Sequence, residues 1–409
     1  MGIARPRKDF TDLLLALLVG LTFTGYPAIS FMSLPFGITG DQSRILTVPY
    51  RMVVLALSLF LFLNAWRRKR LFVGTAMHWL FISLWSIYAF RLTYETVFHA
   101  ETLLFPVYYY WAFGFGVCFG SNLAFMQPLP ERASRLAPWF VWGLALIANL
   151  AGLVFRRQEM LLDKRLEVTE LLNPISYGQC AVTLILMSGY LALNARKIRN
   201  MIFLAACAIP GVFILAITAS RSPLLSFLGG MCLLGIYGIK RGAGWKTMLG
   251  ATVAMGVLPI GIQFLLQGDS AITGRVMDSY ADIKFGGQVD RFVLWSRAFE
   301  QYQQSPYIGN GLEITGVGYP HNITVETLLT MGLGGCVLFI WLQVCFIAKA
   351  KAVLAFDSTA WMSLLALQYM VLTIFSGSFY CSPEFWGLVL LLAGSFGKQL
   401  TRPMEHRFG

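Results

Sequence analysis

The chain has 409 residues, of which 57% are hydrophobic and only 13% are charged, and its mean hydropathy is +0.64. A soluble domain carries roughly 25% charged residues, so this composition excludes an ordinary soluble fold and indicates that most of the surface faces lipid. The net charge of +12 suggests nucleic-acid binding at first sight, but the distribution of the basic residues argues against it.

Twelve apolar runs along the chain have about the length that crosses a bilayer as a helix. The first is long enough to span and is not followed by an A-x-A-like cleavage site, so we expect a retained helix and not a cleaved signal peptide. The sequence therefore predicts an all-α polytopic membrane protein, organised as a single integral membrane domain over residues 1–409. The predicted spans are residues 12–33, 46–66, 71–90, 103–126, 136–155, 174–193, 200–219, 222–239, 247–266, 322–347, 360–379 and 383–399.

The connections between the spans predict the orientation of the chain. Alternate connections carry clusters such as Arg67-Arg68-Lys69-Arg70 and Arg196-Lys197-Ile198-Arg199, and their side of the membrane holds 20 of the 32 basic residues but 5 of the 20 acidic ones. By the positive-inside rule this side is cytoplasmic, and both termini lie on it. The excess of positive charge is then a topology signal and a contact for lipid headgroups, so no nucleic-acid partner is expected.

Two longer polar segments fall on the opposite, external side. The smaller, residues 156–172, holds four basic and four acidic residues and is typical of a solvated or interfacial helix with a structural role. The larger, residues 267–320, joins spans nine and ten. Within it, residues 289–302 place Phe292 and Trp295 on one helical stripe with two further aromatic residues, which predicts an amphipathic helix on the outer membrane surface or against the helix bundle.

Several chemistries are absent from the sequence. The seven cysteines lie in or at the ends of apolar runs and form no C-x-x-C pair, so neither a disulfide framework nor a zinc site is predicted. No metal-binding carboxylate motif, phosphate-binding glycine loop or nucleophile elbow occurs. We therefore expect no cofactor and no metal.

The larger external segment ends in Pro320-His321-Asn322, directly before an apolar helix. Asn322 is a good N-cap, which would place His321 at the positive end of that helix. Such an end attracts anions and lowers the pKa of an imidazole, and a neutral histidine is a competent general base near neutral pH. The alternative is an interfacial histidine that hydrogen-bonds the backbone, and position alone does not choose between the two.

Two arginines occupy unusual places. Arg221, in the turn Ser220-Arg221-Ser222 between spans seven and eight, is expected to be buried and to need a lipid headgroup or a bound diphosphate as partner. Arg291 precedes Trp295 by four residues and shares its helix face; periodicity alone favours an arginine that reaches to lipid headgroups beside an aromatic anchor. The glycines of Gly309-Asn310-Gly311 allow close approach of the backbone to another group.

The order of these motifs resembles the O-antigen ligase and polymerase superfamily of bacterial inner-membrane enzymes. The resemblance implies a glycan donor carried on undecaprenyl diphosphate. The acceptor would be a sugar of the lipid A core for a ligase, or another lipid-linked repeat unit for a polymerase, and the chain length and moderate loops look more like a ligase. The matching motifs are Ser220-Arg221-Ser222, Arg291…Trp295, Gly309-x-Gly311, His321-Asn322…Glu326 and Gly332-Leu333-Gly334-Gly335.

The resemblance also implies roles for single residues in a metal-independent, inverting glycosyl transfer in lipopolysaccharide biosynthesis. His321 would be the base that activates the acceptor hydroxyl. The residues expected to hold the donor diphosphate are Arg221, Arg291 and, as a third clamp, Arg275. The residues expected to support them are Asn322, Glu326, Ser220 and Trp295.

A protein of a different class, a transporter or flippase of lipid-linked oligosaccharides, remains an alternative. Transporters place polar or charged groups near the bilayer midplane, whereas the unusual residues here gather at the external face. That placement favours an enzyme with its active site on the periplasmic face of the inner membrane. The expected partners are the lipid-linked donor, the lipid A core acceptor and membrane lipids. The sequence sets no oligomeric state, and a monomer is compatible with it.

Overall fold

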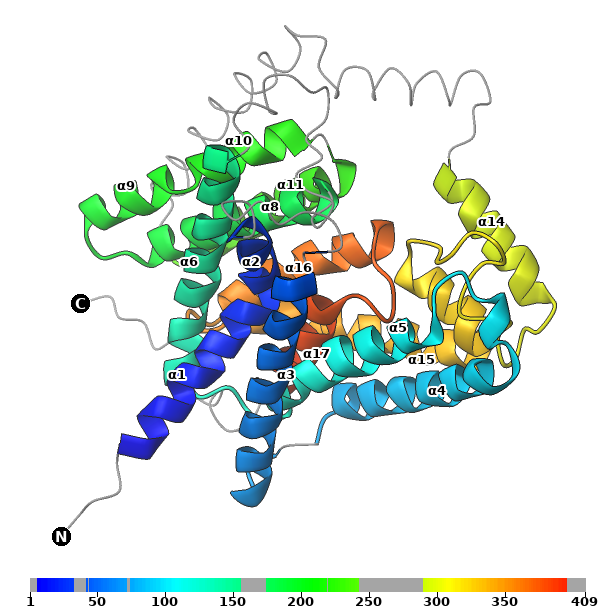
Figure 1. The fold of residues 1–409 in the computed structure, drawn as a ribbon. Helices are drawn as coiled ribbons and strands as arrows, with labels where there is room; N and C mark the ends of the chain where they lie inside the picture. The colour runs from blue at the N-terminus through cyan, green and yellow to red at the C-terminus, as the bar shows by residue number, and fades with distance from the viewer. Residues whose placement is uncertain are drawn as a thin grey trace, which may run out of the picture. The chain divides into compact units, whose positions relative to one another are not determined.

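The computed structural model describes residues 6–32, 42, 44–71, 74–155, 174–218, 220–242 and 290–395. These residues form helices joined by short connections, and no strand occurs among them (Figure 1). Ile314 and Gly318 form one isolated antiparallel bridge. The predicted all-helical class is therefore confirmed for the described part of the chain.

The chain divides into two compact units, which are described separately. The first comprises residues 1–54, 130–287 and 357–368; the second comprises residues 55–129, 288–356 and 369–409. The helices of the first unit are α1 (Pro6–Gly20), η1 (Leu21–Gly25), α2 (Tyr26–Met32), α6 (Glu131–Phe155), α8 (Pro174–Asn194), α9 (Ile198–Ala206), α10 (Ile209–Thr218) and α11 (Arg221–Lys240).

The second unit carries most of the external-loop residues that the sequence singled out. Its helices are α4 (Ala76–Phe98), η4 (Ala100–Thr102), α5 (Val107–Tyr110), η5 (Trp111–Phe119), η6 (Gly120–Met126), α14 (Asp290–Gln303), α15 (Ile323–Val353) and α17 (Pro383–Gly394). Two more helices, α3 (Arg44–Arg67) and α16 (Ala360–Phe375), contribute residues to both units.

Seven helices among the described residues are long and apolar enough to cross a membrane, which makes the protein a multi-pass membrane protein. They correspond to predicted spans one, two, five to eight and ten. The predicted span at 360–379 is shorter than expected, because α16 ends at Phe375 and residues 376–379 are not helical. The predicted span at 247–266 and the segment 156–172 lie outside the described residues. The twelve-span count and the single-domain organisation stay predictions.

Polar side chains tie the helices of the first unit together. The Gln368 amide on α16 donates to the carbonyl of Gln179 on α8 at 2.8 Å, and the Gln179 amide donates to Ser222 and Ser226 on α11 at 3.3 and 3.2 Å. All four residues are buried. Hydrogen bonds of this kind join helices where apolar surroundings provide no competing water. They fix the first turn of α11, where the Ser220-Arg221-Ser222 motif lies.

The second unit is built around α15. Helices α4, α14 and α17 pack against it, and α4 runs alongside it in Figure 1. Aromatic rings join α4 to the connection before α17: the rings of Trp85 and Tyr88 on α4 lie 5.0 and 4.8 Å from the ring of Phe379, measured between centroids. Phe379 also lies 4.8 Å from Trp386 of α17. Rings at these spacings contribute roughly 0.5–1.5 kcal/mol per pair beyond the area they bury.

Helix α15 is broken at Gly332, which has φ of 68° and ψ of −166°. In a continuous helix the amide of Leu333 would donate to the carbonyl of Leu329. Here the Leu333 amide donates to the carbonyl of Pro306 at 2.8 Å, and the Leu329 carbonyl accepts from the amide of Asn310 at 2.7 Å. The loop after α14 thus takes both hydrogen bonds that the break leaves open, and residues 323–331 form a short helical piece of their own.

Candidate functional site

The predicted amphipathic helix over 289–302 is confirmed as α14, which packs its small residue Ala298 against Leu329 of α15 and Ile314 of the following loop. With α14 packed in this way, Arg291 and Trp295, which are one helical turn apart, are half-buried. The Trp295 indole donates to the carbonyl of Pro320 at 3.0 Å. Helix α14 is therefore attached directly to the residue that precedes His321.

His321 lies between that contact and the start of α15. Its backbone has φ of +56°, in the left-handed region that non-glycine residues rarely adopt. The following Asn322 caps the helix, as the sequence predicts: its Oδ1 accepts from the amides of Thr324 and Val325 at 2.9 and 3.2 Å. The Trp295–Pro320 hydrogen bond before His321 and the Asn322 cap after it hold the His321 backbone in this uncommon conformation.

The cap changes how the helix start can act on an anion. The amides of Thr324 and Val325 are taken by the Asn322 side chain, and the amide of Glu326 donates to the Asn322 carbonyl at 2.9 Å. The Glu326 bond is the first regular helix bond, so the cap takes two of the four N–H groups that a helix N-terminus leaves open. Fewer N–H groups remain there for an anion than at an uncapped helix start.

Arg291 is the cation that acts on His321. Burial lowers the pKa of the His321 imidazole, and the positive charge of Arg291 lowers it further. The direction agrees with the sequence-based expectation, but the causes are tertiary contacts. The ring of Tyr319 lies 4.3 Å from the imidazole ring and shields it from solvent. The lowered pKa favours the neutral imidazole, which is the form that accepts a proton.

A further wall of the site comes from residues 376–382, between α16 and α17. The Arg291 guanidinium donates to the hydroxyl of Ser376 at 3.3 Å, and the Tyr380 ring lies 6.1 Å from that of Tyr319, edge to face. Sequence reasoning missed this segment because it assigned residues 376–379 to the end of one span and the other three to the connection that follows it. The serines of Ser376-Gly377-Ser378 between two apolar runs were the available signal.

Glu326 is buried at 1% exposure. Its Oε2 accepts from the amide of Phe379 at 2.9 Å, so this carboxyl fastens the 376–382 segment to the first turns of α15. The other oxygen, Oε1, has no hydrogen-bond partner among the described residues. Glu326 lies one turn into α15, and its hydrogen bond joins this helix to the 376–382 segment.

A cavity of about 500 Å³ lies between α14 and α15. Its wall includes Trp295, whose indole contacts Pro320, and Val325, which follows His321 by four residues. The remaining lining is mostly apolar, and Phe292 and Phe299 expose 65% and 49% of their surface. The lining residues are Phe292, Trp295, Ser296, Ala298, Phe299, Glu300, Gln303, Val325 and Leu328.

In the first unit, Arg221 is the first residue of α11, after Ser220. The expectation of a buried arginine is wrong, because Arg221 is exposed. Pro223 follows it within the first turn, so the helix starts here and the side chain leaves from its end. Ser220 does not cap the helix; its hydroxyl donates to the carbonyl of Thr218 at 3.2 Å instead. Arg275 lies outside the described residues.

No group of three His, Cys, Asp or Glu side chains within the described ranges is arranged to hold a metal ion. Around His321 the polar groups are instead one imidazole, one guanidinium, hydroxyls and a buried carboxyl. Such a set suits an anionic ligand and a proton transfer, since arginine binds phosphate oxygens in a planar fork and a neutral imidazole accepts a proton.

Comparison with known protein families gives one match: the model described as O-antigen ligase matches residues 202–340. The matched range is about a third of the chain, and it supports the resemblance to the O-antigen ligase and polymerase superfamily. The matched range contains Arg221, Arg291 and His321, and all the supporting residues that the sequence predicted. No curated protein matches the chain. One part of the site described above, the 376–382 segment, lies outside the range that the O-antigen ligase family model covers.

Proposed function

We propose that this protein is a metal-independent, inverting glycosyltransferase that moves O-antigen polysaccharide from undecaprenyl diphosphate to a sugar hydroxyl of the lipid A core. The observation that carries the proposal is that Arg291 on α14 lies near enough to His321 for its charge to lower the pKa of the half-buried imidazole, inside a region that matches the O-antigen ligase family. We place the site on the periplasmic face of the bacterial inner membrane, with both termini in the cytoplasm.

In the proposed reaction His321 takes the proton of the acceptor hydroxyl. The acceptor oxygen forms a bond to the anomeric carbon, and the bond from that carbon to the diphosphate oxygen breaks. The diphosphate leaves with the bonding electrons, and attack from the opposite side inverts the anomeric centre. A positioned base contributes roughly 10²–10⁴-fold to such a step, and burial supports this role because it favours the neutral imidazole.

Arg291, Arg221 and Arg275 are proposed to hold the departing diphosphate. A diphosphate is already a good leaving group, so the reaction needs cations that stabilise the developing charge more than an acid that protonates it. Arg291 supports this role by its position, since its charge acts on His321 and its guanidinium is held at Ser376. Asn322, Glu326, Ser220 and Trp295 are proposed as supporting residues.

The apolar cavity between α14 and α15 is proposed to receive the first isoprene units of the donor. Its volume, about 500 Å³, is in the range of ligand sites, and it begins next to Trp295, one turn from Arg291. Replacing Leu328 in its lining by Trp should fill it. We expect this variant to raise the KM for a long-chain donor and to change the KM for a donor with a truncated prenyl chain much less.

The direct test supplies purified protein with a lipid-linked glycan and with lipid A core, and follows the product by gel and mass spectrometry. Extension of the core lipid supports the ligase; extension of the donor in the absence of core supports the polymerase. Uptake of donor into vesicles without any new glycosidic bond would instead support a transporter. Loss of transfer after EDTA treatment would contradict the metal-independent mechanism.

A further inference from the structure

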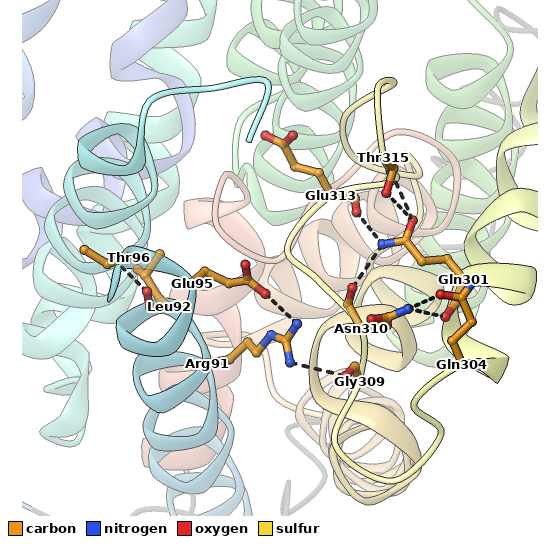
Figure 2. A network of polar contacts seen from close by, with 10 residues as sticks. All are labelled: Arg91, Leu92, Glu95, Thr96, Gln301, Gln304, Gly309, Asn310, Glu313 and Thr315. Atoms are coloured by element: carbon orange, nitrogen blue, oxygen red, sulfur yellow. Dashed lines mark hydrogen bonds and ion pairs between the residues drawn. The ribbon is translucent and has the colours of Figure 1, made fainter. Parts of the chain in front are cut away.

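A buried ion pair on α4, outside the matched family range, contacts the loop that closes the break in α15. Arg91 donates through Nη1 to the carbonyl of Gly309 at 3.2 Å and pairs through Nη2 with Glu95 at 2.5 Å (Figure 2). The two side chains are only 12% and 5% exposed. The predicted span at 71–90 stops just before Arg91, and sequence reasoning did not single out either residue.

The 306–310 loop that Arg91 contacts lies with its backbone directly against the backbone of α15. A Cβ at Gly309 would come within 2.5 Å of the Thr330 backbone, and one at Gly332 within 2.3 Å of the Tyr307 carbonyl oxygen. Tyr307 and Ile308 themselves point outward, with 80% and 71% exposure. Gly309, which the sequence assigned to close approach, and Gly332 are therefore both used for contact between two backbones of the protein itself.

The other end of the loop is held by α14. In Figure 2 the Gln301 side chain faces Asn310 and Thr315. Its Nε2 donates to the carbonyls of Asn310 and Glu313 at 3.1 and 3.0 Å, and its Oε1 accepts from the Thr315 amide at 3.0 Å. Since Asn310 is also the residue that bonds Leu329 of α15, the loop is fixed on α14 by Gln301 and on α4 by Arg91.

We infer that Arg91, with Glu95, is a positioning residue for His321: it holds the 306–310 loop in the break of α15 and so sets the direction of the short helical piece that begins beside His321. The inference rests on the proposed function. The piece 323–331 lacks the continuous hydrogen bonding that would align it with residues 333–353, because the Leu333 amide and the Leu329 carbonyl both bond the loop. Its orientation relative to Arg291 therefore depends on contacts outside the helix ladder: the loop, the Phe379 amide that bonds Glu326 and the Gln343 amide that bonds Thr324.

The test replaces the pair by Arg91→Leu with Glu95→Leu, which removes both charges without leaving one of them buried and alone. We expect a folded protein whose kcat falls roughly 10²-fold, as a displacement of about 1 Å does in active sites, while the KM for the donor changes little. Arg91→Lys keeps the charge but not the planar guanidinium that donates to two partners, so it should retain part of the activity. This variant replaces the double variant in the test if the latter does not fold.

Two further measurements do not depend on transfer. Modification of His321 by diethyl pyrocarbonate, followed by peptide mass spectrometry over a pH series, reports its pKa, which should rise toward the ordinary value when the piece moves away from Arg291. Amide exchange should accelerate at residues 306–310 and 329–333. The matched control is Arg135→Leu with Glu131→Leu, an exposed pair with the same spacing and 63% and 60% exposure, which should change neither readout.

A double variant with wild-type kcat, His321 pKa and amide exchange would overturn the inference. So would a fall in kcat with unchanged pKa and exchange, because the effect would then not pass through His321. Should wild-type protein transfer no glycan, the proposed function fails, whereas the pKa and exchange measurements still show whether Arg91 holds the loop and the helical piece in place.

Discussion

The starts of α11 and α15 carry the two most distinctive motifs of this chain, and they differ in how they are built. At α15, Asn322 caps the helix with two hydrogen bonds, and a tryptophan and a tyrosine hold the half-buried His321. At α11, Ser220 makes no capping bond and Arg221 is exposed. Two motifs that both stand at the start of a helix thus give different results: a side chain held in place at α15 and an exposed charge at α11.

A base needs fixed geometry, because proton transfer requires its ring nitrogen within hydrogen-bond reach of the acceptor hydroxyl. A cation that neutralises a diphosphate tolerates more freedom, since charge attraction varies slowly with distance. The rigid start of α15 and the open start of α11 fit these two tasks. The four predictions below, in order of falling effect, test whether the two helix starts differ in this way.

The largest effect is expected at His321. Replacing His321 by Ala removes the proposed base and should lower kcat roughly 10²–10⁴-fold while the protein still inserts and folds. Transfer from purified lipid-linked donor is the measurement. His99→Ala is the matched control, since His99 is exposed at the end of α4, and it should keep full activity. Substantial turnover by His321→Ala would remove the base assignment.

Lysine variants compare the two arginines. Arg291→Lys and Arg221→Lys keep the charge but lose the planar fork that binds phosphate at two points, so neither should restore full transfer. We expect the loss to be greater at Arg291, on the order of 10²-fold, because this side chain is held in place by Ser376. Steady-state kinetics with varied donor measures both. Full activity of both variants would contradict the bidentate clamp.

The third prediction concerns pH. His321 acts only when neutral, and its pKa lies below the ordinary value because of burial and then Arg291. Wild-type activity should therefore persist below pH 6.5 and fall only as the pH drops through this lowered pKa. Arg291→Gln removes the second cause and should move the acid limb of the profile to higher pH. Tyr319, whose ring lies 4.3 Å from the imidazole ring, stays unchanged in this variant.

The pH comparison has its control at the other helix start. Arg221→Gln should leave the position of the acid limb where it is in the wild type, although it lowers the rate. An acid limb that does not move in Arg291→Gln would show that the charge of Arg291 does not act on the catalytic group.

The smallest effects are expected at the caps. Asn322→Ala removes two capping hydrogen bonds and should lower the free energy of unfolding by about 1 kcal/mol, whereas Ser220→Ala removes no cap and should change it far less. Thermal unfolding in detergent compares the two variants directly. Equal losses would mean that the two helix starts do not differ in the way described.

The local features that the sequence predicts are those that depend on near neighbours. The stripe of aromatic residues between Phe292 and Tyr302 predicted α14 because a helix brings residues three and four apart onto one face. Asn322 predicted a cap because its side chain reaches amides two and three residues ahead. The apolar runs predicted membrane helices because the length and hydropathy of a segment are local quantities.

Contacts between distant segments were not accessible in this way. Burial of Arg221 was expected from a short turn, but exposure depends on what packs around the turn. Ser376 was hidden in a predicted span and Tyr380 in the short connection after it, because an apolar run does not mark where its helix ends. Arg91 lies 218 residues before Gly309, and no local pattern connects them.

The membrane class, the helix of residues 290–303, the cap at Asn322 and the motif order of the superfamily all follow from the amino-acid sequence. The three-dimensional contacts were needed to find that Arg291 acts on His321, that Gly309 and Gly332 serve a contact between two backbones, and that Arg91 of α4 bonds the loop at Gly309. The physical reason is that periodicity and capping involve a few consecutive residues, whereas burial and electrostatic effects on a side chain depend on which distant segments fold against it.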